Sequence, residues 1–272
     1  MTALRRNGTR HRKTISLALA VAAIAVLFSI PIGNFGGAGA SAAYYYYNPG
    51  GGPATLVLMP AAATNTVGTT HTVTATVTQG GNPIESVIVN FSVTGSVTLG
   101  GSCTTDANGM CSFSYSGPAL PGADVITAFA DLNNNGTRDA DEPTATATKA
   151  WVLPASTTGH VTGGGQISVA GDDVTFGFNA KSTGGDVKGG CTVVDHDTGT
   201  KIKCLDATAL VQSGNEATIY GHASQDGGPA TTYVIRVVDN GESGRGQDTF
   251  SIETGSGYSA SGTLTAGNIQ VH

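Results

Sequence analysis

The chain has 272 residues, of which only 12% are charged, while 40 are glycine and Thr and Val recur throughout. This composition is poor in the Leu, Glu, Lys and Ala mixtures that helices favour, so it predicts an all-β protein of about two domains. The formal net charge of −6 becomes 8 − 19 = −11 beyond the five basic residues among the first fourteen. Such an acidic chain without basic clusters argues against nucleic acid and anionic lipid as partners.

Residues 1–43 have the pattern of a secretory signal peptide. Basic residues precede an apolar run from Ile15 to Ile30, and Ala40-Ser41-Ala42 offers small residues for cleavage. The run is short for a membrane span, and an uncleaved N-terminal anchor is the alternative. We therefore expect an extracellular protein, secreted or associated with the cell surface, with no membrane contact beyond this segment.

Residues 44–53 form a short Tyr/Gly/Pro linker that begins with four adjacent tyrosines. The Pro and Gly that follow favour a flexible mature N-terminus, and an adhesive role for the tyrosines is the alternative.

Residues 54–152 show the alternation of half-buried strands. Val73, Ala75 and Val77 alternate with threonines, and the same period returns between Val87 and Val93. Turn signals separate these runs, including Asn108-Gly109, whose residue types tolerate positive φ. About seven short strands at this spacing predict an immunoglobulin-like β-sandwich.

This segment contains several distinctive short stretches, which are Val67-Gly68-Thr69-Thr70-His71-Thr72-Val73-Thr74-Ala75, Asn82-Pro83, Val89-Asn90-Phe91, Thr105-Asp106-Ala107-Asn108-Gly109 and Ala128. In these residues it resembles the bacterial immunoglobulin-like (Big-1-like) domains of invasin- and intimin-type surface proteins. The resemblance implies the sandwich fold. It does not select one function, because such modules serve as stalks, spacers and adhesin tips.

After a linker at 153–158, residues 159–272 predict a second antiparallel β-domain, either a sandwich or an up-and-down barrel. The first and last strands are expected to pair and so hide both edges. The eight expected strands are Val161–Val169, Val174–Ala180, Cys191–Asp195, Lys201–Leu205, Ala217–His222, Tyr233–Val238, Thr249–Glu253 and Ser259–Val271.

This half also contains distinctive short stretches, which are His160-Val161-Thr162-Gly163-Gly164-Gly165-Gln166-Ile167, Phe176-Gly177-Phe178-Asn179-Ala180-Lys181, Val194-Asp195-His196, Asp239-Asn240-Gly241-Glu242, Asp248-Thr249-Phe250-Ser251-Ile252 and Gly267-Asn268-Ile269-Gln270. In these residues it resembles a secreted bacterial module found at the C-termini of surface proteins, the post-anchor (post-COAP-1-like) domain. The resemblance implies no activity that can be assigned to a residue.

Four cysteines occur at hairpin spacing, Cys103 with Cys111 and Cys191 with Cys204. In an exported chain, even counts at this spacing predict two disulfides, each between residues nearly opposite on a hairpin. A metal site is the alternative, but the sequence contains no C-x₂-C or nearby H-x₃-H pattern to support it.

The strongest chemical motif is the stretch from Asp131 to Glu142. It fits the twelve-residue calcium-loop pattern D-x-[DN]-x-[DN]-G-x₅-E at every specified position. Short β-prone segments flank it in place of helices, so we expect a structural calcium loop between the last two strands of the sandwich. The alternative is a solvated acidic hairpin tip without an ion. The predicted ligands are Asp131, Asn133, Asn135, Thr137 through its backbone carbonyl, Asp139 and Glu142.

Weaker candidates are Asp195-His196-Asp197 at a hairpin tip, a set of three acids at Asp239, Glu242 and Asp248, and the single strand histidines His160 and His222. The sequence has no G-x-S-x-G or H-E-x-x-H motif. We therefore expect a non-catalytic exported protein used in surface adhesion or as a spacer, with a surface protein or glycan as its partner. A carbohydrate- or small-ligand-binding C-terminal domain is the alternative, and an unrecognised enzyme is the third reading.

Overall fold

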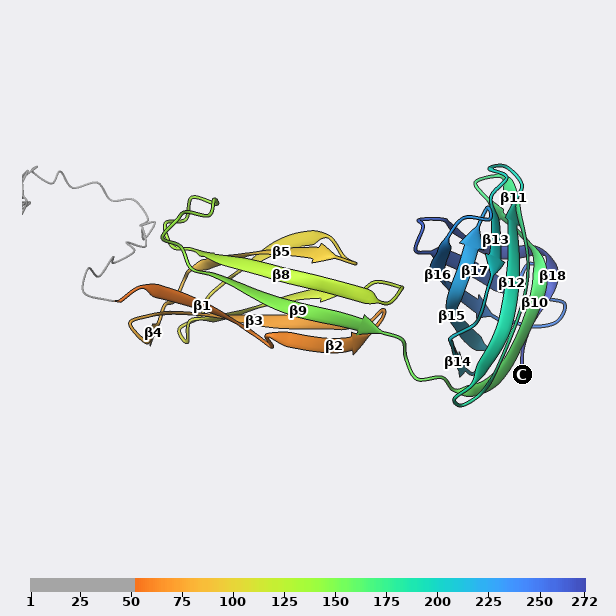
Figure 1. Cartoon of the computed structure of the whole chain (residues 1–272), viewed down its shortest axis with the longest axis horizontal. Helices are drawn as coiled ribbons and strands as arrows, with labels where there is room; N and C mark the ends of the chain where they lie inside the picture. The colour runs from red at the N-terminus through yellow and green to blue at the C-terminus, as the bar shows by residue number, and fades with distance from the viewer. Residues whose placement is uncertain (1–51) are drawn as a thin grey trace, which may run out of the picture. The chain divides into compact units, whose positions relative to one another are not determined.

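The computed structural model describes residues 52–272, and all of its regular secondary structure is β (Figure 1). The all-β prediction is therefore confirmed. The predicted signal peptide and nearly all of the Tyr/Gly/Pro linker lie outside the described residues.

The first half of this range is a sandwich of two sheets. One sheet contains β1 (Ala54–Met59), β3 (Thr70–Gln79), β4 (Asn82–Pro83) and β7 (Met110–Ser116), with β3 pairing to the other three. The other has the order β2-β9-β8-β5-β6, with strands β2 (Ala62–Thr66), β9 (Thr144–Val152), β8 (Gly122–Asp131), β5 (Ile88–Gly95) and β6 (Leu99–Thr104). All pairs are antiparallel except β2 with β9.

The expected alternation is what fills the sandwich. Val73, Ala75 and Val77 are fully buried, while the threonines between them face outward or lie at intermediate depth. The core continues across the sheets to Phe91, Ile126 and other apolar residues. Period-2 burial of Val, Ile and aromatic side chains on one face of each sheet is the main stabilising contribution.

The second half is a closed barrel of eight strands in up-and-down order (Figure 1). Its strands are β10 (Thr158–Val169), β11 (Asp172–Thr183), β12 (Val187–Asp195), β13 (Lys201–Cys204), β15 (Glu216–Gln225), β16 (Ala230–Val238), β17 (Thr249–Thr254) and β18 (Ser259–Val271). The eight expected strands are all present. The first and last of them, β10 and β18, pair as predicted and close the ring.

One strand of this half was not predicted. β14 (Ala209–Ser213) pairs with residues 216–220 of β15, while β13 pairs with residues 223–225 along the same edge of β15. β14 therefore pairs with the part of the β15 edge that β13 does not reach.

Aromatic side chains fill the barrel interior. Phe176 and Phe250 stack with ring centroids 3.8 Å apart, and Phe178 and Tyr233 are buried in the same core. Small barrels of eight strands have an interior that side chains can fill completely. Among the residues that the structure describes, no helix has the length and apolar character needed to cross a membrane.

Candidate functional site

The acidic loop joins β8 to β9, which are neighbouring antiparallel strands. Asp131 is the last residue of β8, and the carbonyl of Pro143 accepts the N–H of Ala130 at 3.1 Å to close the hairpin behind the loop. The loop therefore lies between the last two strands of the sandwich, as its flanking sequences predicted.

The first carboxylate of the pattern is buried and holds the turn. Asp131 is 2% exposed, and its two oxygens accept the backbone N–H groups of Asn135 at 3.1 Å and Gly136 at 2.8 Å. The chain bends here through positive φ at Asn134 (58°) and Gly136 (76°), which Asn and Gly tolerate best.

The last carboxylate closes the loop from the other end. Glu142 is 5% exposed and accepts the N–H of Leu132 at 2.8 Å and the N–H of Asp139 at 3.0 Å, one with each oxygen. Both ends of the pattern therefore bond to backbone amides across the loop, which fixes its shape. Charge-assisted bonds of this kind are about twice as strong as neutral ones.

The middle positions converge on Asp139. Asn133 and Asn135 each donate a side-chain N–H to its Oδ2, at 2.7 Å and 2.8 Å. The Oδ1 of Asn135 accepts from the backbone and hydroxyl of Thr137, both at 2.8 Å. These two amide NH₂ groups thus provide the partial positive charge beside the Asp139 carboxylate. A half-turn of each amide about χ2 would present oxygen in place of nitrogen.

The donor chemistry of the loop fits a hard cation, although its carboxylates alone do not form a metal site. Within residues 52–272 there is no group of three or more His, Cys, Asp or Glu side chains placed to hold a metal ion. Calcium also accepts amide and backbone carbonyl oxygens, and it takes six to eight oxygens at about 2.4 Å. Asp131, Asp139 and Glu142 with two asparagine oxygens and the Thr137 carbonyl would supply such a set.

Both expected disulfides are present. Cys191–Cys204 joins β12 to β13 one position beyond the pair Thr192–Lys203, so it lies across one sheet as predicted. Cys103–Cys111 differs from the prediction, because β6 and β7 belong to different sheets. The hairpin turn between them passes from one sheet to the other, so this disulfide ties the two sheets together at their edges. The two bonds indicate an oxidising environment.

A buried polar cluster in the sandwich was not predicted. Asp124 is 2% exposed and accepts three hydrogen bonds, from the Trp151 indole at 2.6 Å, the Val97 N–H at 2.8 Å and the Tyr115 hydroxyl at 3.1 Å. Burial and the adjacent Asp124 carboxylate raise the pKa of Tyr115. The sequence held a signal for this cluster, since Asp124 has the same strand parity as the inward-facing Ile126 and Ala128.

Two bases complete the cluster. Lys149 on β9 is the cross-strand register partner of Asp124 on β8, and its ammonium lies 4.2 Å from the centroid of the Trp151 ring. His71 meets the Trp151 and Tyr115 rings edge to face. Burial lowers the pKa of Lys149, and burial together with the Lys149 charge lowers the pKa of His71. The enclosed groups make this cluster a structural feature of the core.

The hairpin tip at Asp195-His196-Asp197 is explained by its turn. Asp195 accepts the N–H groups of Asp197 at 3.1 Å and Thr198 at 3.0 Å, and these bonds lower its pKa. The His196 ring contacts the Thr175 hydroxyl at 2.9 Å rather than either aspartate. The residues form an Asx-type turn and do not converge on one point.

The acids at 239, 242 and 248 anchor a loop to the last strand. Asp248 is fully buried and accepts the N–H of Ile269 at 2.9 Å, while Asp239 accepts the N–H of Val271 at 3.1 Å. Glu242 accepts side-chain amides from the same strand, those of Asn268 and Gln270. Each carboxylate is used separately.

The two strand histidines have different neighbours. His222 contacts the Asp206 carboxylate at 3.0 Å on an exposed part of the barrel, and His160 stacks on His272 with centroids 5.0 Å apart. Neither belongs to a group of metal-binding side chains within the described residues.

The chain has no significant similarity to any protein-family model or to any curated protein. The resemblances drawn from its motifs therefore stay expectations.

Proposed function

We propose that the chain is a non-catalytic exported protein that serves in surface adhesion or as a structural spacer, and that calcium binds the β8–β9 loop and stabilises the sandwich. The observation that carries the proposal is the loop itself, whose terminal carboxylates Asp131 and Glu142 are both buried and bonded to backbone amides. The two disulfides and the filled cores support a role in which shape is maintained outside the cell.

Calcium would act on stability rather than as a switch. Strands, not helices, flank the loop, so ion binding has no helix pair to open. The ion would offset most of the negative charge of the four carboxylates within residues 131–142, where Arg138 is the only basic residue. Its coordination would also turn the Asn133 and Asn135 amides, which now donate to Asp139.

Calorimetry of the purified protein in calcium and in chelator tests the proposal. For an extracellular site with a Kd of about 10⁻⁴ to 10⁻³ M, 10 mM calcium would stabilise the sandwich by about 1.4–2.7 kcal/mol. At about 4 °C per kcal/mol this raises its Tm by about 6–11 °C.

Two matched variants show whether the rise in Tm comes from an ion bound in the loop or from general screening of charge by calcium. Glu142→Gln should remove most of the calcium-dependent rise. Asp141→Asn changes the same charge on an exposed residue for which we assign no ligand role, so it should keep the rise. An equal Tm in calcium and chelator would contradict the calcium part of the proposal.

A further inference from the structure

We propose that the outer face of β11, β12 and β13 is a docking surface for an acidic polysaccharide in which uronate units alternate with neutral sugars. The inference rests on the adhesive form of the proposed function and adds to it a surface and a class of partner. It starts from four lysines that lie up to 22 residues apart in sequence and that the barrel gathers on one face, at 181, 188, 201 and 203.

Strand register places these lysines in two groups. Lys181 and Lys188 are direct cross-strand partners at one end of β11 and β12. Lys201 and Lys203 lie at the other end, where Lys203 pairs with Thr192. Thr192 is four residues from Lys188 along β12, so the two groups are about 13 Å apart at about 3.3 Å per residue.

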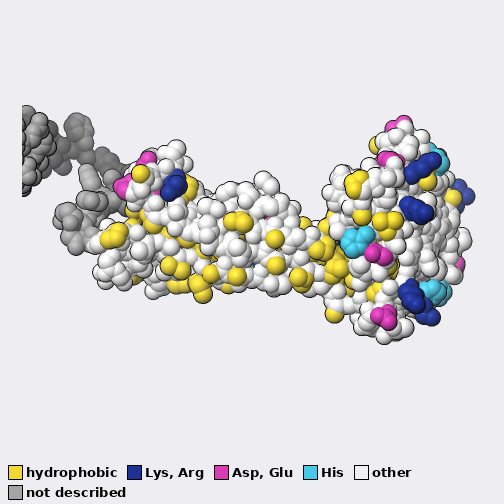
Figure 2. Space-filling model, in the orientation of Figure 1, with side chains coloured by type: hydrophobic (Ala, Val, Ile, Leu, Met, Phe, Trp, Pro, Cys, Tyr) yellow, Lys and Arg dark blue, Asp and Glu magenta, His cyan; other side chains and the backbone are white. Residues whose placement is uncertain are grey.

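The lysines are exposed, and one acid lies beside them, since the Asp226 carboxylate accepts the backbone N–H of Lys201 at 2.7 Å. The ion pairs of the described residues, His222 with Asp206 and Arg236 with Glu253, involve none of the four. Two like charges placed directly opposite across a strand pair, as at Lys181 and Lys188, destabilise a sheet unless something neutralises them. Figure 2 shows dark blue side chains along this side of the barrel, with magenta and cyan side chains among them. An anionic ligand would relieve the repulsion.

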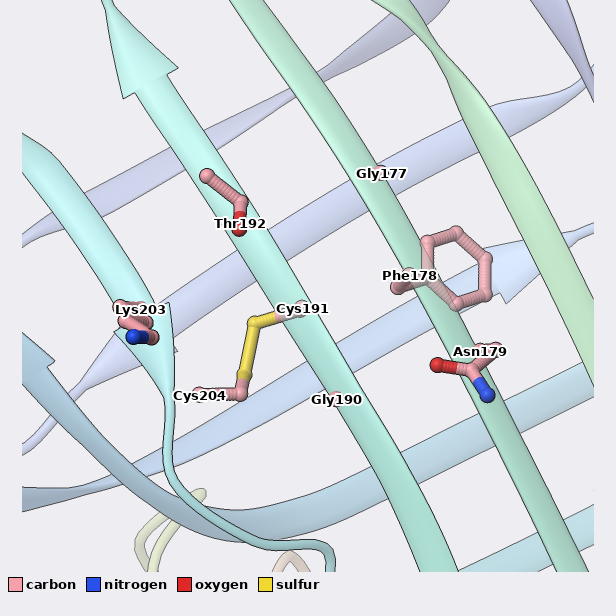
Figure 3. A pocket seen from close by; sticks show the side chains of 8 residues that line it. All are labelled: Gly177, Phe178, Asn179, Gly190, Cys191, Thr192, Lys203 and Cys204. Atoms are coloured by element: carbon pink, nitrogen blue, oxygen red, sulfur yellow. A yellow bond between two sulfur atoms is a disulfide. The ribbon is translucent and has the colours of Figure 1, made fainter.

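The surface between the two pairs of lysines carries no other charged side chain and is slightly recessed. A shallow depression of about 460 Å³ lies there, and Figure 3 shows the residues that line it. Its outward positions on β11 and β12 are Gly177, Asn179, Gly190 and Thr192, and a Cβ at Gly177 or Gly190 would meet no atom within 4 Å. Bare backbone beside amide and hydroxyl groups suits the hydroxyl-rich face of a sugar. A second depression of about 550 Å³ continues the surface past Lys201 and Lys203, and Asp226 lines it beside them.

The charge spacing distinguishes a glycan from a nucleic acid. A nucleic acid strand carries a phosphate about every 3.4 Å, whereas here about 13 Å of neutral surface separates the cationic groups. The one aromatic residue that lines the first depression, Phe178, is buried, so it offers no exposed ring for base stacking. The four cations are lysines, which act as point charges and do not need the fork geometry that favours phosphate recognition by arginine.

Isothermal titration of the full chain with hyaluronan oligosaccharides, in which glucuronate alternates with a neutral N-acetylated sugar, tests the inference. We expect saturable binding that weakens as salt rises, and no binding of neutral chitin oligosaccharides. The double variant Lys188→Gln/Lys203→Gln should weaken binding at least 10-fold. The control Arg138→Gln/Arg245→Gln makes the same change of net charge outside the surface and should alter binding less than 2-fold.

Absence of hyaluronan binding, equal binding by the lysine variant, or tighter binding of a single-stranded oligonucleotide would each overturn the inference. All four lysines are exposed, so an unchanged circular dichroism spectrum and Tm will confirm that the variants fold. The proposed calcium clamp is tested separately: its melting experiment can fail while glycan binding stands, and the reverse also holds.

Discussion

Removal of the Asp124 carboxylate should cost the sandwich a large part of its stability. In Asp124→Ala, three donors lose their acceptor: the buried Trp151 indole and Tyr115 hydroxyl, and the partly buried Val97 N–H. Each stranded donor costs about 1–3 kcal/mol. Because the three share one acceptor their costs do not add fully, and loss of one partner from a buried charged network typically costs about 3–5 kcal/mol. We expect a loss of about 4 kcal/mol.

Urea unfolding followed by fluorescence measures this loss in the sandwich alone, because Trp151 is the only tryptophan of the chain. With a slope of about 1.5 kcal/mol per M, a loss of about 4 kcal/mol lowers the urea midpoint by about 2.7 M. Asp124→Asn keeps one acceptor oxygen and should cost less, about 1–3 kcal/mol.

Glu85→Ala is the control, because Glu85 is an exposed acid of the same sandwich and its loss should stay within about 0.5 kcal/mol. If Asp124→Ala costs less than about 1 kcal/mol, the three hydrogen bonds do not hold the core together and the reasoning fails.

Two further predictions concern the same domain. His71 is the only histidine between residues 54 and 152, and its pKa is lowered in the folded sandwich, so the unfolded chain binds more protons than the folded one as pH falls below 6.5. The stability of the sandwich should therefore fall as pH drops through 6.5. His71→Phe should flatten this pH dependence, measured by fluorescence-detected unfolding between pH 5.5 and 7.5. The double variant Cys103→Ser/Cys111→Ser opens a loop of eight-residue separation, which should cost about 2–3 kcal/mol by chain entropy; a cost near zero would mean that the sheet edges stay together without the bond.

Local sequence patterns predicted those parts of the fold that have strong alternation. The threonine and valine alternation around Val73 identified β3, and β-type composition between turn signals located all eight barrel strands. No range was predicted for β1, β2, β4, β6 or β14. β6 contains Gly100 and Gly101, which have low strand propensity, and a Cβ at Gly101 would collide with the Phe113 ring. The glycine is required by packing against another strand, which no local pattern contains.

The two polar sites of the sandwich also differ in whether local sequence could predict them. The acidic loop was predictable because all its proposed ligands lie within twelve consecutive residues, and the flanking sequences indicated strands in place of helices. The Asp124 cluster needs side chains from β3, β7, β8 and β9, which only the packing of two sheets brings together. The alternation of β8 did indicate that Asp124 points inward. Its role could not be predicted, because the sequence does not show which groups donate hydrogen bonds to it.

Charge shows the limit of composition most clearly. The acidic total led to the expectation of a chain without basic clusters, and along the sequence that expectation is correct beyond the first fourteen residues. Antiparallel register changes the result in space, because it places Lys181 beside Lys188 and sets Lys203 on the neighbouring strand. Residues that face each other across a strand pair can be far apart in sequence, because the length of the connecting turn sets their separation. The electrostatic potential of a sheet surface therefore depends on which residues the register places side by side, and not on the net charge of the chain. The face of β11 to β13 can therefore attract an anion although the chain as a whole repels one.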